Sequence, residues 1–173
     1  MRLIKEINRK VEREYVFVTG QLDIDVFYFI EKIKKGVDEK ENMSYRTNIQ
    51  GKMTSYTYFN DDLKFTNIIR TFNKYMDSNY MLPKYDLKDS WGYILHPGEK
   101  TRFHEHNSVY SGSIYLNDCE QPLYFPEIKQ QVIPKPGVFC IFSGWLEHGC
   151  EINDTDNNKF GLSFNMNQFQ NTL

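Results

Sequence analysis

The sequence predicts an α+β protein that is mainly β, with two helices laid against an antiparallel core of the sandwich or jelly-roll type. Phe and Tyr account for 13 and 12 of its 173 residues, whereas alanine is absent. Aromatic side chains pack well on pleated sheets, so this composition favours strands over helices. Helical spacing of apolar residues in two segments of the first half, and short apolar runs through the second half, complete the prediction.

Two segments of the first half have the apolar spacing of amphipathic helices. Residues 22–37 carry apolar side chains every three to four positions, with Asp23 or Asp25 as the expected N-cap and Gly36 near the end. Residues 61–81 repeat this spacing, and between the two helices residues 42–60 are expected to form short strands around Gly51. Both apolar stripes are expected to be buried against the core.

The pattern changes near Ser90, where short apolar runs alternate with turn residues. Six or so strands at a spacing of roughly ten residues are typical of a β-sandwich or a closed jelly roll. The runs are SWGYIL, SGSIYL, PLYF, QQVIP, VFCIF, CEI and FGLSFNM. We expect a single domain, 1–173, with residues 1–89 as a mixed helix and strand support region and residues 90–167 as the β core that carries the site.

Charge and cysteine content narrow the possible partners and the compartment. The formal net charge is -2, so there is no basic footprint for nucleic acid. Cys119, Cys140 and Cys150 form no CxxC pair, which favours a reducing cytoplasm, the host cytoplasm if the gene belongs to a phage. No window approaches the roughly 20 apolar residues of a spanning helix, and the first residues have no apolar stretch like that of a signal peptide, so no membrane association is expected.

The four histidines all fall in the predicted β region, and two of them are two positions apart. His104 and His106 share one face of a strand, where Glu105 points to the other, and His148 follows an apolar strand that could bring a third imidazole. Imidazole is the commonest transition-metal ligand, so these three are candidate metal ligands. The alternative is a solvated strand edge, because the HxH pair alone is a weak signal. His96 precedes Pro97-Gly98 and is expected in a turn.

Three motifs follow the HxH pair in a fixed order: SGSIYLN at 111–117, PKPGVFCIFSGWLEHG at 134–149 and KFGLSFNMN at 159–167. This succession resembles the Fe(II)/2-oxoglutarate-dependent oxygenases, especially their small prolyl-hydroxylase-like and phage-associated branches. The resemblance covers roughly residues 90 to 167. It implies a double-stranded β-helix, a jelly-roll and cupin-like core, with the N-terminal helices as support.

The resemblance also implies roles for individual residues in iron binding. His104 and His148 match the family's two histidine ligands, and His106 takes the place of the usual carboxylate. Three neutral imidazoles would leave the charge of Fe(II) uncompensated by the protein. Glu105 could supply a carboxylate only through a bulge, because strand alternation points it to the opposite face.

The cosubstrate contacts implied by the resemblance are Lys159, Tyr115, Ser163 and, near the position of a family tyrosine, His96. Lys159 stands where the family has a basic residue, often arginine, that pairs with the distal carboxylate of 2-oxoglutarate, and Tyr115 would hydrogen-bond the same group. Lysine lacks the planar fork of arginine, so this contact is expected to be weaker. Gly161 stands where the family often has serine, which removes one hydroxyl. Trp145, Tyr93 and Phe103 are candidate pocket walls.

The function implied is a dioxygenase that uses Fe(II), 2-oxoglutarate and O2 to hydroxylate an unidentified substrate, which could be a peptide, a nucleotide or a small molecule. One rival is a three-histidine cupin-type iron dioxygenase that needs no 2-oxoglutarate, because GEKTRFHEH also fits a cupin opening. The other rival is a non-catalytic jelly-roll binding module, since fold does not imply function. The sequence indicates no oligomeric state.

Overall fold

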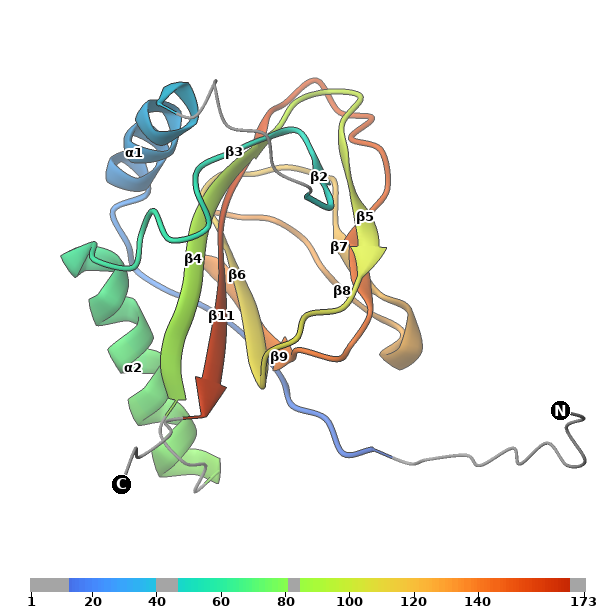
Figure 1. The fold of residues 1–173 in the computed structure, drawn as a ribbon. Helices are drawn as coiled ribbons and strands as arrows, with labels where there is room; N and C mark the ends of the chain where they lie inside the picture. The colour runs from blue at the N-terminus through green and yellow to red at the C-terminus, as the bar shows by residue number, and fades with distance from the viewer. Residues whose placement is uncertain (1–12, 40–46, 81–84, 169–173) are drawn as a thin grey trace, which may run out of the picture.

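The computed structural model describes residues 13–39, 47–80 and 85–168, and in these ranges two antiparallel sheets face each other with two helices on one side (Figure 1). The helices are α1 (Val26–Asp38) and α2 (Leu63–Tyr80), and a short 3-10 turn covers Pro126–Ile128. The strands are β1 (Phe17–Gln21), β2 (Ile49–Gln50), β3 (Lys52–Met53), β4 (Tyr85–Leu95), β5 (Lys100–His104), β6 (Tyr110–Tyr115), β7 (Leu123–Phe125), β8 (Gln130–Val132), β9 (Val138–Ser143), β10 (His148–Cys150) and β11 (Lys159–Gln168).

The strands pair in an order that closes the core into a double-stranded β-helix. The larger sheet has the order β1-β9-β6-β11-β4-β3 and the smaller one the order β2-β5-β10-β7-β8. Strands β1 to β3, which precede residue 89, pair into both sheets, so the support region contributes to the core as well as to the helices. The predicted fold class, mainly β with two supporting helices, is confirmed.

The helices cover the face of the six-stranded sheet that points away from the smaller sheet (Figure 1). Phe29 and Ile33 of α1 and Phe65 of α2 are buried in one apolar cluster with Leu162 and Phe164 of β11. Burial of large aromatic and aliphatic side chains is the dominant stabilising term in such a layer. The apolar faces of both helices are therefore buried against the sheet, as their spacing in the sequence predicts.

The opposite face of the same sheet is much more polar, and it forms one wall of the space between the sheets. Along β11, Leu162 and Phe164 point to the helices, so strand alternation turns Lys159, Gly161 and Ser163 inward. The register places Tyr115 of β6 beside Gly161 and Ser113 beside Ser163, while Ser111 lies beside Asn165. Burying such a row of polar side chains costs free energy unless each group finds a hydrogen-bond partner, as Ser111 does with Asn165 and Ser113 with the Leu162 carbonyl.

Local signals account for most of the elements. The Asp25 side chain accepts a hydrogen bond from the Tyr28 N–H and so caps α1, which selects one of the two predicted caps. Gly98, in the turn between β4 and β5, has a φ of 85°, in the left-handed region that favours glycine.

Strand β1 was not predicted, and the strand expected at CEI lies earlier, at His148–Cys150. Part of the expected 42–60 strand segment, residues 42–46, lies outside the described residues.

Candidate metal centre

Two of the candidate ligands lie directly opposite each other on paired strands. His104 ends β5, His148 begins β10, and the two residues are partners in the antiparallel register. His106 lies two residues past the end of β5, where its backbone N–H donates to the Gly144 carbonyl at 2.8 Å. Glu105, between the two histidines, is exposed and lies past the end of β5, so its carboxylate is not part of the triad.

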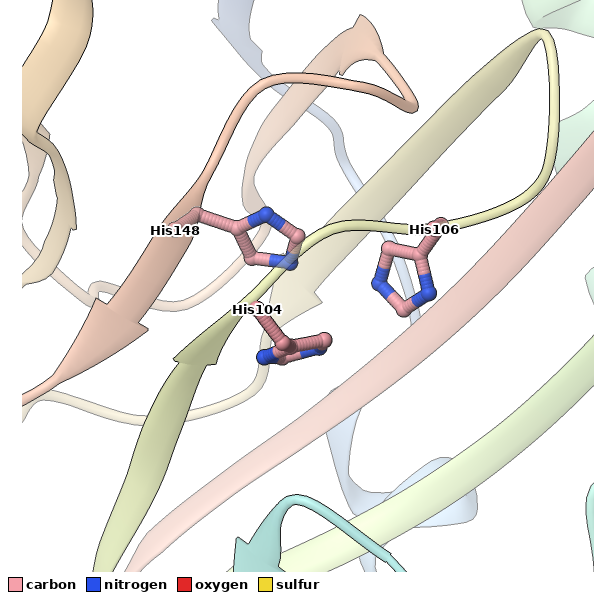
Figure 2. Close-up of side chains that lie close together, drawn as sticks. All are labelled: His104, His106 and His148. Atoms are coloured by element: carbon pink, nitrogen blue, oxygen red, sulfur yellow. The ribbon is translucent and has the colours of Figure 1, made fainter. Parts of the chain in front are cut away.

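The three imidazoles share one small space (Figure 2). Their ring centroids are 4.5 Å apart for His104 and His148, 4.8 Å for His104 and His106, and 5.0 Å for His106 and His148. One nitrogen of each ring lies within 4.8 Å of one nitrogen of each of the others. Small side-chain rotations close such a spacing onto one ion with metal–nitrogen distances of about 2.0–2.1 Å.

Backbone carbonyls hold two of the rings in the orientation that a ligand needs. His104 Nδ1 lies 2.7 Å from the Arg102 carbonyl oxygen, and His148 Nδ1 lies 2.9 Å from the Leu146 carbonyl oxygen. A carbonyl can only accept, so each Nδ1 carries the proton and each Nε2 keeps its lone pair for a metal. Among the described residues no hydrogen bond holds the ring of His106. Its neighbour is Trp91, whose ring centroid lies 6.3 Å away.

All three histidines are set up to remain neutral at neutral pH. Burial lowers the pKa of His106 to about 3, with further lowering by His104 and Lys88. Burial also lowers the pKa of His148 well below its ordinary value, helped by the two other imidazoles. The pKa of His104 is lowered by burial as well, against the opposing effects of the Arg102 carbonyl and Glu147. Neutral imidazole is the form that ligates metals.

The triad lines a cavity of about 50 Å³ between the two sheets. Trp91 and Tyr93 of β4, Ser113 of β6, Phe142 of β9 and Ser163 of β11 form much of its wall. Of the candidate walls, Tyr93 therefore lines this cavity, while Phe103 lines a separate surface groove with Tyr124 and Phe125. The predicted cosubstrate contact Ser163 is at the cavity, with its Oγ 3.5 Å from Ser113 Oγ.

Lys159 and Tyr115 lie deeper, next to the cavity wall. Lys159 is 0% exposed, and its ammonium donates to the Gln121 carbonyl at 2.9 Å and to Cys150 Sγ, which lines the cavity, at 3.2 Å. In the described part of the chain no carboxylate lies within ion-pair distance of Lys159 Nζ. Lysine is almost never fully buried without a charged partner, so Lys159 is an unusual buried cation that the described carboxylates do not balance.

The hydroxyl of Tyr115 is also without a proper partner. Tyr115 is 0% exposed, the Lys159 ammonium lies 5.3 Å from its ring centroid, and its Oη makes no hydrogen bond of good geometry to the described residues, although Ser113 is beside it. A buried unpaired hydroxyl costs about 1–3 kcal/mol. Neither Lys159 nor Tyr115 lines the cavity that holds the triad, and their role as cosubstrate contacts stays a prediction.

His96, the fourth predicted cosubstrate contact, is placed in the turn after β4. Its backbone N–H donates to Glu99 Oε2 at 2.7 Å, and its Nδ1 lies 2.9 Å from the same oxygen. It does not line the cavity that holds the triad. Its partner here is Glu99, a residue that stabilises the turn.

Comparison with known proteins gives a clear result for structure and none for sequence. No protein-family model and no curated protein sequence matches the chain. The fold is similar to a viral collagen prolyl hydroxylase from Paramecium Bursaria Chlorella virus-1 in complex with 2-oxoglutarate, with a TM-score of 0.69 and 16% identity over 91% of this chain and 97% of that one. It is also similar to a Pseudomonas putida prolyl-4-hydroxylase, with a TM-score of 0.67 and 12% identity over 89% and 93% of the two chains.

The fold is that of the 2-oxoglutarate oxygenases. The non-heme, alpha-ketoglutarate-dependent carbocyclase SnoK from nogalamycin biosynthesis shares it too, with a TM-score of 0.67, 11% identity and coverage of 89% of this chain and 79% of that one. The resemblance of residues 90 to 167 to these oxygenases is thus confirmed at the level of fold. At these identities the roles of single residues depend on the geometry of this chain.

Sequence reasoning missed several residues at the histidine cavity or gave them no role. Trp91, Thr101, Ser113 and Cys150 line it, and the indole N–H of Trp91 is buried without a hydrogen-bond partner in the described residues. A usable signal was present, because Trp91 lies two positions from Tyr93 on one strand and Ser113 lies two positions from Tyr115 on another, so each pair shares a face of its strand.

Among the described helices, none is both long and apolar enough to cross a membrane.

Proposed function

We propose that the protein is an Fe(II)- and 2-oxoglutarate-dependent dioxygenase that hydroxylates an organic substrate. The observation that carries this proposal is the pairing of two features in one interior. Three neutral imidazoles converge in a cavity between the sheets, and a fully buried lysine without a carboxylate partner lies behind its wall. A metal explains the first feature and an anionic cosubstrate explains the second.

The metal part of the proposal rests on the donor set. His104 and His148 present Nε2 lone pairs because their Nδ1 atoms donate to backbone carbonyls, and His106 completes a triad. Imidazole nitrogens suit iron, and three protein ligands leave positions open for other ligands. The absence of a carboxylate in the triad leaves the metal charge for an anionic ligand to balance, which favours a keto acid.

The cosubstrate part rests on unmet bonding needs. Lys159 Nζ offers a buried positive charge, and Tyr115 Oη offers a hydroxyl that the described residues leave unpaired. A carboxylate accepts hydrogen bonds from both kinds of donor, and such charge-assisted bonds are the strong ones. We assign these two residues to the distal carboxylate of 2-oxoglutarate, and Ser163 to the cavity between them and the triad.

When bound, iron and 2-oxoglutarate supply the oxidising chemistry for hydroxylation with O2. The chain's own part is to hold the metal through three imidazoles, two of them oriented by backbone carbonyls, and to neutralise the cosubstrate. It also excludes water with the aromatic walls Trp91, Tyr93 and Phe142. Loss of water strengthens every electrostatic contact inside the cavity.

The proposed substrate is a peptide, a nucleotide or a small molecule. The neighbours in fold include a collagen prolyl hydroxylase, a carbocyclase and an epimerase, so this fold serves different chemistries. The three cysteines are buried and free, which agrees with the proposed location in a reducing cytoplasm.

An anaerobic titration with Fe(II) and then 2-oxoglutarate tests the proposal. Wild-type protein should develop the weak visible charge-transfer band of an iron keto-acid chelate. His148→Ala should lose both iron and band, whereas Lys159→Ala should keep iron and need a higher 2-oxoglutarate concentration for the same band. Iron binding by wild type without the band would contradict the proposal and favour the three-histidine cupin-type dioxygenase. No iron binding would favour a binding module.

A further inference from the structure

Gly161 sits between two inward-pointing tyrosines on neighbouring strands. In the register of the six-stranded sheet its partners are Tyr93 on β4 and Tyr115 on β6. A Cβ atom on Gly161 would overlap the ring and the hydroxyl oxygen of Tyr93. The end of the Tyr93 ring therefore occupies the space that a side chain at position 161 would need.

The Tyr93 hydroxyl lies in the same neighbourhood as the proposed carboxylate-binding groups. Tyr93 and Tyr115 interact electrostatically, and Cys150, which contacts Lys159 Nζ at 3.2 Å, influences both phenols. Lys159 is two residues before Gly161 on β11 and so points to the same side of the sheet. Tyr93 and Cys150, whose thiol contacts Lys159 Nζ, both line the histidine cavity.

The Tyr93 hydroxyl donates to Ser113 Oγ through a long hydrogen bond, which a carboxylate can replace because it is a stronger acceptor. Ser113 Oγ donates its single proton to the Leu162 carbonyl at 3.2 Å, so it can only accept from Tyr93. The distance between Tyr93 Oη and Ser113 Oγ is 3.4 Å, which is long for a bond between two hydroxyls. Burial raises the pKa of Tyr93 far above its usual range, so the phenol stays a donor at any physiological pH.

We propose that Tyr93 is a cosubstrate-binding residue whose hydroxyl donates to the distal carboxylate of 2-oxoglutarate, beside Lys159 and Tyr115. In this reading Tyr93 supplies from β4 the hydroxyl that a serine at position 161 would supply from β11. The assignment rests on the proposed function and adds a residue to it. Gly161 is then a positioning residue, because only a residue without a side chain lets the Tyr93 ring lie across the strand.

Binding of two keto acids to the Mn(II)-loaded protein, measured by anaerobic calorimetry, tests the role of the hydroxyl. 2-Oxoglutarate has the distal carboxylate, whereas 2-oxobutyrate keeps only the metal-chelating keto-acid end. Tyr93→Phe should weaken 2-oxoglutarate binding about tenfold or more, as expected for loss of a hydrogen bond to a charged group, and should change 2-oxobutyrate binding less than twofold. Tyr115→Phe is the matched variant and should behave in the same way.

The controls separate this inference from the proposed function. If wild type binds neither keto acid, both the function and the role of Tyr93 are wrong. If wild type binds 2-oxoglutarate and Tyr93→Phe binds it equally well, the role of Tyr93 alone is wrong. Equal weakening for both keto acids in Tyr93→Phe would mean a disturbed metal site, and it would also refute a contact with the distal carboxylate.

Moving the hydroxyl to the neighbouring strand provides a second test that does not depend on Tyr93→Phe. Gly161→Ser alone should weaken 2-oxoglutarate binding, because its side chain displaces the Tyr93 ring. The double variant Gly161→Ser with Tyr93→Ala should bind 2-oxoglutarate several-fold more tightly than Tyr93→Ala alone, since the serine restores one hydroxyl. No gain in the double variant would overturn the proposed equivalence of the two positions.

Discussion

At the scale of single residues, the three histidines are not equivalent. His104 and His148 each donate through Nδ1 to the carbonyl two residues earlier, whereas no such bond holds the ring of His106 among the described residues. His106 also stands outside the strands, two residues past the end of β5. Fixed rings bind metal with less loss of side-chain entropy, so His104 and His148 should carry most of the affinity.

Substitution of each histidine should reveal this difference. We expect His148→Ala to lower the affinity for Fe(II) or Mn(II) at least 100-fold. His106→Ala should lower the same affinity by a factor about ten times smaller, on the order of tenfold. His106→Asp should keep metal binding, because a carboxylate oxygen can replace an imidazole nitrogen as an iron ligand. Competition with a chromophoric chelator measures the affinities. Wild-type affinity in both His106→Ala and His106→Asp would show that His106 is not a ligand.

At the scale of elements, one carboxylate joins the two supporting helices. Asp62 is 4% exposed, and it caps α2 by accepting from the Phe65 N–H at 2.9 Å. The same side chain accepts a 2.6 Å hydrogen bond from Tyr28 Oη of α1 and pairs with the Lys32 ammonium of α1. The cap, the ion pair and the phenol contact therefore fix how α1 lies against α2 beneath the six-stranded sheet.

Asp62→Asn should destabilise the protein at neutral pH and change its acid sensitivity. Burial raises the pKa of Asp62, but Lys32, Tyr28 and the Phe65 N–H outweigh it, so the net pKa is lowered. A lowered pKa gives stability that is present above the unfolded value of about 4 and is lost as the pH falls through the folded value. We expect the variant to lose about 2–4 kcal/mol of unfolding free energy at pH 7.

Urea unfolding across pH provides the measurement for this carboxylate. The wild-type and Asp62→Asn curves should approach each other below about pH 4, where the carboxylate of the wild type becomes protonated. Asp25→Asn is the matched control, because Asp25 caps α1 in an exposed position and pairs with Lys64 at the surface. Its effect should be smaller. A constant difference between wild type and Asp62→Asn down to pH 2 would contradict the assigned role.

At the scale of the whole molecule, the two sheets are stabilised in different ways. The six-stranded sheet is backed by two helices and a large aromatic cluster, which includes Phe65 and Phe164 at 6.0 Å between ring centroids. The smaller sheet has short strands and carries His104 and His148 on the paired strands β5 and β10. A metal held by these histidines and His106 would tie this sheet together at the mouth of the cavity.

Metal and cosubstrate should therefore raise the thermal stability of the whole molecule. A ligand at 100 times its dissociation constant adds about 2.7 kcal/mol to the unfolding free energy. For a domain of this size that corresponds to a rise in Tm of several degrees. Scanning fluorimetry with Mn(II), then with Mn(II) and 2-oxoglutarate, should show two successive increases in Tm. The same shift with Mn(II) in His148→Ala would contradict binding at the triad.

The sequence by itself determined the fold class, both helices, most strands and the three histidines that the structure brings together. These features depend on local periodicity, on strand alternation and on motif order, all of which are visible along the chain. Strand β1 escaped prediction because it forms by pairing with β9, from Phe17 opposite Phe142 to Gln21 opposite Val138. That pairing involves a partner more than a hundred residues away.

Only the tertiary structure decided which polar side chains share the interior. The placement of His96 with Glu99 and of Lys159 without a carboxylate could not be read from either residue's neighbours in sequence. The same holds for Tyr93, whose ring occupies the space left by a glycine 68 positions later in the chain, beside Tyr115. The physical reason is that burial and hydrogen-bond satisfaction are properties of groups brought together by strand register, and register depends on the packing of the whole sheet.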